Sequence, residues 1–215
     1  MSDSETTVIL VRHGEVAEEH KGTFYGCADV PLSEEGEIGS PLLAAKIVED
    51  EPPDAIYCSP LERTMAVAEP LAAVAGLDIV QDPDFRELDR GSWVHLSHEQ
   101  LEQQSPGAIK RYLDDPENGN APDGEKESVF TARVWGALDR VLAAHPGERV
   151  VVVTHGHVIR VCMRRVLGWD VATSFQHFMP YHALVEMRLR ADGSGEVVRA
   201  PDGHMPLALR YGQGG

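Results

Sequence analysis

Two short apolar runs constrain the fold of this chain more than any other feature. Residues 8–11 (Val-Ile-Leu-Val) and 150–153 (four valines) have the length and the β-branched content of buried strands. One polar residue, a histidine and a glycine follow each run, at 12–14 and at 154–156. In open α/β sheets, ligands bind beyond the carboxyl ends of the strands. We therefore expect the two histidines to meet at one edge of a sheet.

Strand and helix patterns alternate along most of the chain. Besides the two apolar runs, short strands are expected at 54–58 and 77–80. The stretch 183–189 alternates apolar and polar residues, and a turn at 192–193 lets residues 196–198 pair with it as a hairpin. This order predicts an α/β fold, a three-layer α/β/α sandwich with a mainly parallel sheet and an antiparallel edge strand.

Caps, prolines and glycines mark where the helices are expected to begin and end. Their starts are placed after Ser33, with an interruption or restart at 40–41, and then at 59–60, at the capping box of Ser97, at 105–106, near 125 and at 157. On the long helix from about 125 to 144, the inner face is expected to carry Val129, Ala132, Val134, Leu138, Val141 and Leu142.

The segment from about 82 to 125 is expected to be an inserted helical cap over the carboxyl edge of the sheet. It combines short helix patterns with a polar loop, 114–124, that is rich in proline, glycine and asparagine. No linker or internal repeat divides the chain. Residues 1–215 are therefore predicted to form a single domain, with a loose tail over the last dozen residues.

The charge and cysteine content exclude several classes of protein. The chain has 19 basic and 35 acidic residues, a net charge of −16, which argues against a nucleic-acid or acidic-membrane surface. Its 3 cysteines are far apart and form neither a disulfide framework nor a zinc motif. No secretory signal and no membrane-spanning run is evident. We expect a cytoplasmic protein with reduced thiols.

Five segments, in order along the chain, carry a resemblance to a known family. They are residues 10–15, 26–36, 59–64, 85–93 and 154–156. They resemble the R-H-G signature, the G-x-x-D-x-P-L-[ST]-x-x-G segment, the S-x-L-x-R-[AT] helix start, the L-x-E-x-x-x-G-x-W loop and the [ST]-H-G strand end of the histidine phosphatase superfamily, also called phosphoglycerate-mutase-like. R-H-G alone recurs by chance, whereas five ordered segments are a specific signal.

The resemblance implies a role for each residue of a phosphate cage. His13 would be the nucleophile that forms a phosphohistidine, with its second nitrogen tied to the backbone by a hydrogen bond that sets the tautomer. Arg12, Arg63 and a protonated His155 would surround the phosphoryl oxygens, and the helix start at Gly156 would add N–H groups. Such a cationic cage supplies the charge that a metal ion would otherwise bring.

Glu87 would protonate the leaving alkoxide and then activate water, with Asp89 as the alternative acid. Tyr25 and Gly26 are candidate contacts to the substrate. The residues that could recognise the leaving group are Tyr25 itself, His95, Lys110, Arg111 and Lys126. The remaining histidines form no recognised ligand set, so no metal and no other cofactor is expected.

The sequence departs from the family pattern beside the pocket. Val16 replaces a hydroxyl residue, and Glu19 or its neighbour His20 stands where the family has an asparagine. His95 and Lys126 interrupt two further motifs. A carboxylate at 19 would repel phosphate unless it turns away or pairs with Lys21. These changes leave catalysis plausible and put the identity of the substrate in doubt.

The resulting prediction is a metal-independent phosphatase that hydrolyses a small phosphorylated metabolite through a phosphohistidine on His13, as a monomer or homodimer. Two alternatives stay open. One is an isomerase of the cofactor-dependent phosphoglycerate mutase type, which would need a second anion site. The other is a protein-directed phosphatase, or a binding module that has lost turnover.

Overall fold

The computed structural model describes residues 4–201, and the expected loose tail lies outside this range. One mixed sheet runs through the described chain, with the strand order β3-β2-β4-β1-β5-β6. The strands are β1 (Thr6–Arg12), β2 (Ala55–Cys58), β3 (Ile79–Gln81), β4 (Arg149–Thr154), β5 (Leu184–Leu189) and β6 (Gly195–Arg199). The first four pair in parallel, and β5 and β6 are antiparallel. The expected mainly parallel sheet with an antiparallel edge is confirmed.

The register between β1 and β4 places the two His-Gly motifs side by side. Arg12 lies opposite Thr154, so His13 and His155 leave the sheet at the same level. The main-chain N–H of His13 donates to the carbonyl of Thr154 at 3.1 Å. The neighbouring, parallel positions of the two strands therefore bring together residues that are far apart in sequence.

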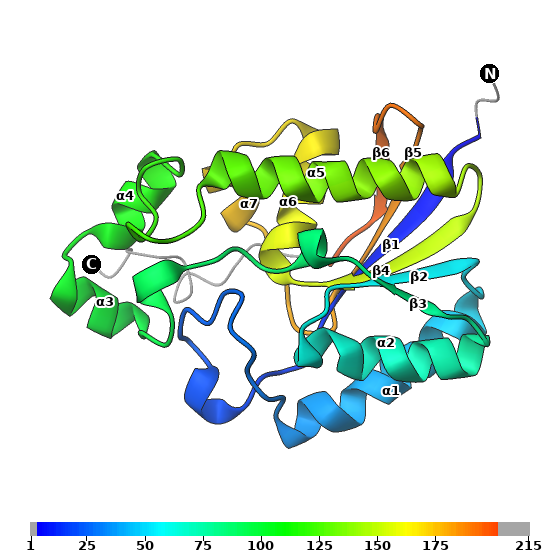
Figure 1. Ribbon diagram of the computed structural model, residues 1–215, viewed down its shortest axis with the longest axis horizontal. Coiled ribbons are helices and arrows are strands. Elements are labelled where there is room, and N and C mark those ends of the chain that lie inside the picture. Colours follow the sequence, from blue (N-terminus) through cyan, green and yellow to red (C-terminus); the bar gives the residue numbers. More distant parts are fainter. Residues whose placement is uncertain (1–3, 202–215) are drawn as a thin grey trace.

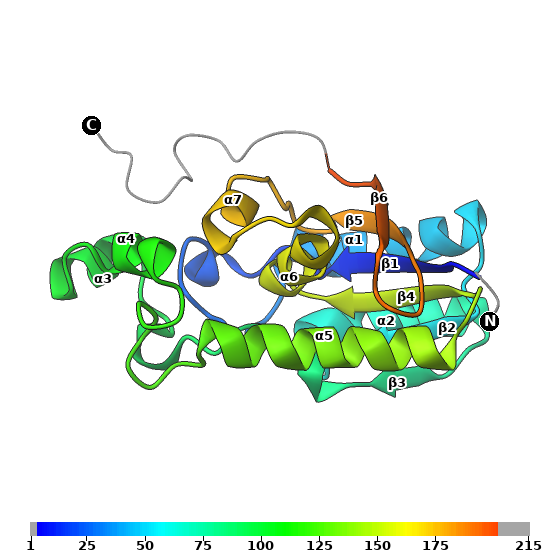
Figure 2. The same ribbon diagram turned by 90° about the horizontal axis from the view of Figure 1, so that it is seen from above.

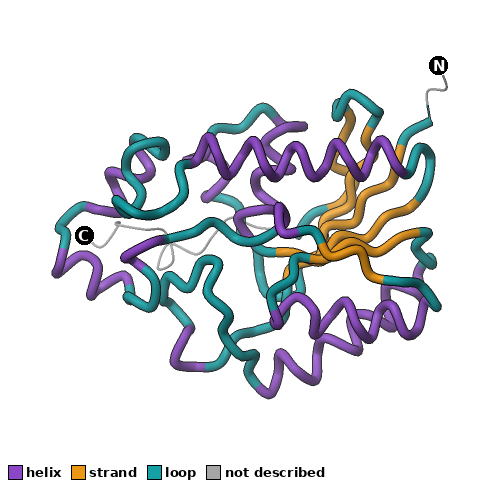
Figure 3. The backbone as a smooth tube through the Cα atoms, viewed as in Figure 1, coloured by secondary structure: helices purple, strands orange, loops and turns teal. Residues whose placement is uncertain are grey.

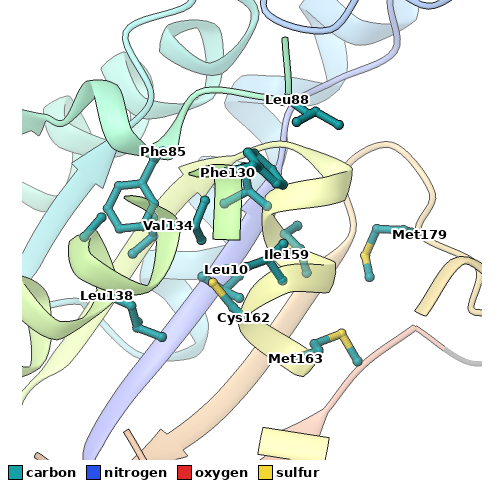
Figure 4. Close-up of a cluster of buried hydrophobic side chains, with 14 of the residues drawn as sticks. Leu10, Phe85, Leu88, Phe130, Val134, Leu138, Ile159, Cys162, Met163 and Met179 are labelled. Carbon is teal, nitrogen blue, oxygen red and sulfur yellow. The ribbon is translucent and has the colours of Figure 1, made fainter. Parts of the chain in front are cut away.

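Helices cover both faces of the sheet (Figures 1 and 3). On one face lie α1 (Glu34–Asp50) and α2 (Glu62–Ala75), and on the other lie α5 (Glu127–Ala144) and α6 (Gly156–Leu167). Successive residues of β1 alternate between these layers: Ile9 and Val11 pack with α1 and α2, whereas Leu10 packs with α5 and α6. Figure 4 shows part of the second core, with Leu10 beside Val134, Leu138 and Cys162.

The remaining short helices lie beyond the carboxyl ends of the parallel strands. They are α3 (His98–Gln104), α4 (Ala108–Asp114) and α7 (Val171–Phe175), with 3₁₀ turns η1 (Glu18–His20), η2 (Pro83–Phe85) and η3 (Gly91–Trp93). Figure 2 shows α3 and α4 projecting past the end of the sheet. The capping box of α3 is confirmed: Ser97 Oγ accepts from Gln100 N at 3.1 Å, and Gln100 Oε1 accepts from Ser97 N at 2.8 Å.

Several helix boundaries differ from the expected ones. Pro41 lies inside a continuous α1, because the hydrogen bond it cannot make falls on the exposed side of the helix. Helix α2 begins at Glu62 and not at Ser59, because Ser59 still belongs to the strand end and donates its N–H to Val153. Helix α4 begins at Ala108. Helix α7 was not expected.

The inner face of α5 was placed wrongly at its start. Val129 is 54% exposed, and Ala132 also faces solvent. The buried stripe of the helix instead consists of Phe130, Val134, Ala137, Leu138, Val141 and Leu142. Phe130, the first residue of this stripe, is large enough to fill the space next to η2. From Phe130 onward, the buried residues follow the spacing of one helix face.

Candidate active site

His13 lies at the carboxyl end of β1 and is almost fully buried. Its Nδ1–H donates to the carbonyl of Gly14 at 2.8 Å, which leaves the lone pair on Nε2. Burial, together with the charges of Arg63 and Arg12, lowers the pKa of His13 well below its usual value. The imidazole is therefore neutral near pH 7, as a nitrogen nucleophile must be.

His155 lies at the end of β4, with its ring centroid 5.3 Å from that of His13. Its Nε2 is 2.8 Å from Ser59 Oγ, whereas its buried Nδ1 has no hydrogen-bond partner. Burial and the charges of Arg63 and the other site cations lower the pKa of His155 as well. The ligand-free site therefore favours a neutral His155 over the expected protonated ring, because burial penalises a charged imidazole and the two nearby guanidiniums repel it.

The two guanidiniums of the expected cage converge on His13. Arg63 is 1% exposed and donates from Nη1 to Ala28 O and from Nη2 to Gly26 O, both at 2.6 Å. Arg12 donates from Nη1 to the carbonyl of Met179. The Nε–H of each arginine is buried without a partner. Buried donors are normally paired, so these two N–H groups mark a place for an acceptor that comes from outside the chain.

Glu87 reaches the same region from the loop between η2 and η3. Its Oε1 accepts from Leu88 N at 2.9 Å and its Oε2 from His157 N, in the first turn of α6, at 3.1 Å. Gly156 begins this helix directly against Arg12: a Cβ at position 156 would lie 3.4 Å from Arg12 Nε. The start of α6 thus orients the carboxylate and leaves room for the guanidinium.

A pocket of about 520 Å³ opens beside these residues. Of the residues predicted for the site, Arg12, Glu87, Tyr25, Gly26 and Gly156 line it. His13, Arg63 and His155 do not line it because they are almost fully buried, and Tyr25 and Tyr181 lie close to His13. The ring centroids of these tyrosines are 6.3 and 5.8 Å from that of His13.

The end of α7 and the segment that follows it form a pocket wall that was not predicted from sequence. Phe175, Phe178, Met179, Pro180 and Tyr181 line the pocket. The guanidinium carbon of Arg12 lies 4.3 Å from the ring centroid of Tyr181. The cluster of aromatic and proline residues between 175 and 181 was the available signal, but no local pattern shows that this segment returns to the sheet edge.

Four of the candidates for reading the leaving group lie outside the pocket wall: His95, Lys110, Arg111 and Lys126 are exposed. Lys110 pairs with Asp114 and Lys126 lies 3.7 Å from Glu117. Asp89 accepts from Gly91 N at 2.8 Å and lines a separate cavity.

Two departures from the family pattern also have a structural explanation. Val16 is buried and pairs with Leu32 in an isolated bridge, so the apolar side chain serves packing. Glu19 lies in η1 and is exposed, which resolves the expected repulsion of phosphate. Lys21 pairs instead with Glu15 and Glu18, at 2.9 Å each.

Residues 4–201 contain neither a candidate metal centre nor a membrane-spanning helix. No group of three or more His, Cys, Asp or Glu side chains in this range is arranged to hold a metal ion. None of the helices in the same range has both the length and the apolar surface needed to cross a membrane.

Comparisons with known proteins agree with the geometry. The chain is 32% identical to Phosphoserine phosphatase 1 of Hydrogenobacter thermophilus over 165 residues, which are 77% of this chain and 78% of the relative. It is 31% identical to Probable phosphoglycerate mutase GpmB of Cronobacter sakazakii over 85% of this chain and 80% of the relative. The solved structure of Bacillus stearothermophilus YhfR superposes with a TM-score of 0.79 at 26% identity, covering 90% of this chain and 95% of that one. The sequence profile of the histidine phosphatase superfamily (branch 1) matches residues 8–202, and the chain belongs to this superfamily.

Proposed function

We propose that this protein is a metal-independent phosphatase that hydrolyses a small phosphomonoester through a phosphohistidine on His13. One observation supports this most directly: a neutral imidazole, fixed by its hydrogen bond to Gly14, lies among two arginines with unpaired buried N–H groups and a second imidazole. A nucleophile and a set of donors for one anion thereby lie close together.

In the first step, Nε2 of His13 attacks phosphorus and the bond to the ester oxygen breaks. The unpaired Nε–H groups of Arg12 and Arg63 are placed to donate to the phosphoryl oxygens. His155 would donate from Nδ1 as a neutral ring, with the Ser59 hydroxyl donating to its Nε2. Glu87, in its protonated form, passes its proton to the departing alkoxide.

In the second step, water attacks the phosphohistidine and the nitrogen–phosphorus bond breaks. Glu87 is now ionised and takes a proton from the attacking water, so the carboxyl returns to its starting state. The products are inorganic phosphate and free His13. The arginines balance the charge of the phosphoryl group in both steps, so no metal ion is required by this scheme.

The size and position of the pocket favour a small substrate over a protein. A volume of about 520 Å³ suits a metabolite-sized molecule. Two tyrosine rings beside His13 restrict access to the nucleophile. Phosphatase activity also agrees with the name of the relative from Hydrogenobacter thermophilus.

Isomerisation is the second candidate function, because another relative is named a probable phosphoglycerate mutase. A mutase holds the product of the first step and returns the phosphoryl group to a different oxygen. The two reactions are distinguished by incubating the protein with a monophosphoglycerate, with and without a bisphosphorylated primer. Phosphate release without the primer supports hydrolysis, and primer-dependent isomerisation supports the mutase.

The decisive experiment compares the unaltered protein with His13→Ala on 4-nitrophenyl phosphate and on a panel of phosphorylated metabolites. We expect hydrolysis in the presence of a chelator, an acid-labile phosphoenzyme, and loss of both in the variant. Unchanged turnover by a folded His13→Ala protein contradicts the nucleophile assignment. A chelator-sensitive activity that a divalent ion restores contradicts the metal-independent scheme.

A further inference from the structure

We propose that Arg90 binds a carboxylate on the leaving group, so that the preferred substrates are phosphomonoesters of small hydroxy acids. This inference rests on the proposed function and extends it to the far side of the same pocket. Arg90 follows Glu87 by three residues and lines the pocket together with Phe24 and His98. None of the residues expected to read the leaving group, apart from Tyr25, lines this wall.

The charge of Arg90 is not balanced by an acid of the described chain. Although the protein carries a net charge of −16, no carboxylate in residues 4–201 lies within ion-pair distance of this guanidinium. Its polar partners are neutral: Asn120 Oδ1 at 3.4 Å and the hydroxyl of Tyr112. On the neighbouring helix α5, by contrast, Arg133 and Arg140 pair with acids at 2.7 and 2.8 Å.

The side chain is held in place by packing and not by charge. Its guanidinium carbon lies 4.6 Å from the ring centroid of Tyr112 and 5.9 Å from that of Phe24. Contacts of this kind fix the plane of a guanidinium while its edge N–H groups remain able to donate. A planar guanidinium with a fixed orientation can form two parallel hydrogen bonds to one carboxylate.

The position of Arg90 links it to the phosphate cage. A Cβ at Gly26 would lie 3.1 Å from Arg90 Cγ, and the carbonyl of Gly26 accepts from Arg63. Both arginines therefore lie next to Gly26. A compact substrate with its phosphoryl group at Arg63 would direct the remainder of the molecule toward Arg90, past Glu87.

The other basic groups in the pocket favour a single negative charge over a second phosphate. Lys21 is balanced by Glu15 and Glu18. Burial and the charge of Arg90 lower the pKa of His98. Arg160 uses Nε, Nη1 and Nη2 to donate to three main-chain carbonyls. Arg160 keeps its charge, but its N–H groups donate to the main chain. Arg90 is therefore the guanidinium here that we assign to the ligand, and a single guanidinium balances the single charge of a carboxylate.

The test uses pairs of substrates that differ in one anionic group. O-phosphoserine is compared with O-phosphoethanolamine, and 3-phosphoglycerate with glycerol 3-phosphate, in the unaltered protein and in Arg90→Gln, Arg90→Lys and the control Arg188→Gln. Arg188 is exposed on β5, outside the pocket. A third pair, fructose 6-phosphate and fructose 1,6-bisphosphate, tests whether the pocket prefers a substrate with a second phosphate group. Thermal unfolding of every variant shows whether the fold is retained.

We expect the unaltered protein to prefer the carboxylate in at least one of the first two pairs. In Arg90→Gln, kcat/KM for that substrate should fall about 10- to 100-fold, whereas kcat/KM for its partner and for 4-nitrophenyl phosphate should change less than about threefold. Arg90→Lys should keep part of the preference, and Arg188→Gln all of it.

Three results overturn the proposal: no carboxylate preference in either pair, an equal loss on both members of a pair, or a preference confined to the bisphosphate. An equal loss on both members of a pair would show that Arg90 has a structural role. A preference confined to the bisphosphate would show that Arg90 binds a second phosphate. Each of these leaves hydrolysis through His13 intact. Failure of the proposed function is recognised separately, by the absence of His13-dependent hydrolysis of 4-nitrophenyl phosphate.

Discussion

Arg133 on α5 donates from Nη2 to the main-chain carbonyl of Glu87 at 3.1 Å. Its Nη1 also donates to the carbonyls of Asp84 and Arg86, at 2.7 and 2.8 Å. The same guanidinium forms a two-point contact with Glu125, at 2.7 and 2.8 Å. Helix α5 therefore holds the loop backbone around the residue that we propose as the acid. Arg133 is in this scheme a positioning residue, since it contacts only the backbone of Glu87.

Arg133→Gln should displace Glu87 and so affect proton transfer to the leaving group. We expect kcat/KM for an alkyl phosphate to fall about 10- to 100-fold, which is less than the roughly 100- to 10,000-fold that general acid catalysis contributes, because Glu87 itself is still present. Nitrophenolate leaves without a proton, so kcat/KM for 4-nitrophenyl phosphate should change far less. Arg140→Gln, two turns further along α5, is the matched control, because its pairs with Asp82 and Asp84 are at the surface. An equal loss on both substrates would show a general structural defect.

Glu87→Gln tests the acid directly. The amide cannot release a proton to the alkoxide or take one from water, so turnover of an alkyl phosphate should fall at least about 100-fold. Attack by His13 on 4-nitrophenyl phosphate remains possible, and the phosphohistidine should then accumulate because its hydrolysis lacks a base. The measurement is a burst of nitrophenolate together with acid-labile label from radioactive substrate. Rapid turnover without a burst would move the acid–base role to another residue.

Ser59→Ala tests whether the hydroxyl sets the tautomer of His155. Ser59 Oγ lies 2.8 Å from Nε2, and Nδ1 has no partner. Loss of the hydroxyl lets the ring carry its proton on Nε2, which removes the donor directed at phosphate. A hydrogen bond to a charged group contributes about 1.5–3 kcal/mol, so we expect kcat/KM to fall by about 10-fold or more, while Ser59→Thr retains activity. Equal activity of Ser59→Ala and the unaltered protein refutes this role.

The sheet and the meeting of the two histidines could be predicted from sequence for a physical reason. Four-residue apolar runs rich in β-branched residues are typical of buried strands in a parallel sheet. The carboxyl ends of neighbouring parallel strands lie at the same edge of that sheet. His13 and His155 inherit their positions from the backbone register of β1 and β4. Helix boundaries were less predictable where a residue forms hydrogen bonds with partners that are distant in sequence. Ser59 is an example, because its N–H donates to Val153 and its hydroxyl lies within hydrogen-bond distance of His155.

The far wall of the pocket could not be predicted, because tertiary packing decides it. Tyr181 contacts Arg12 only because the chain returns to the sheet edge after α7. The neutral state of His155 depends on burial and on Arg63, which no local pattern reveals. Arg90 reads in sequence as one charge of a polar loop, and its isolation from acids is visible only in the folded protein.

The two buried histidines also predict how stability depends on pH. Burial holds the pKa of His13 and of His155 well below 6.5 in the folded protein. In the unfolded chain each takes up a proton near pH 6.5, so between that value and its folded pKa the unfolded chain binds more protons. The free energy of unfolding therefore falls as the pH falls below about 6.5, by up to about 1.4 kcal/mol per pH unit for each histidine.

Replacing either histidine should make this pH dependence less steep. We expect urea unfolding between about pH 7.5 and 5.5 to show a smaller loss of stability for His13→Gln and for His155→Gln than for the unaltered protein. The exposed His95 provides the matched control, His95→Gln, which should keep the full dependence because it does not remove a buried neutral imidazole. The same slope in all four proteins would mean that the site imidazoles take up protons in the folded state. His13 would then not be the neutral nucleophile that the proposed reaction requires at mildly acidic pH.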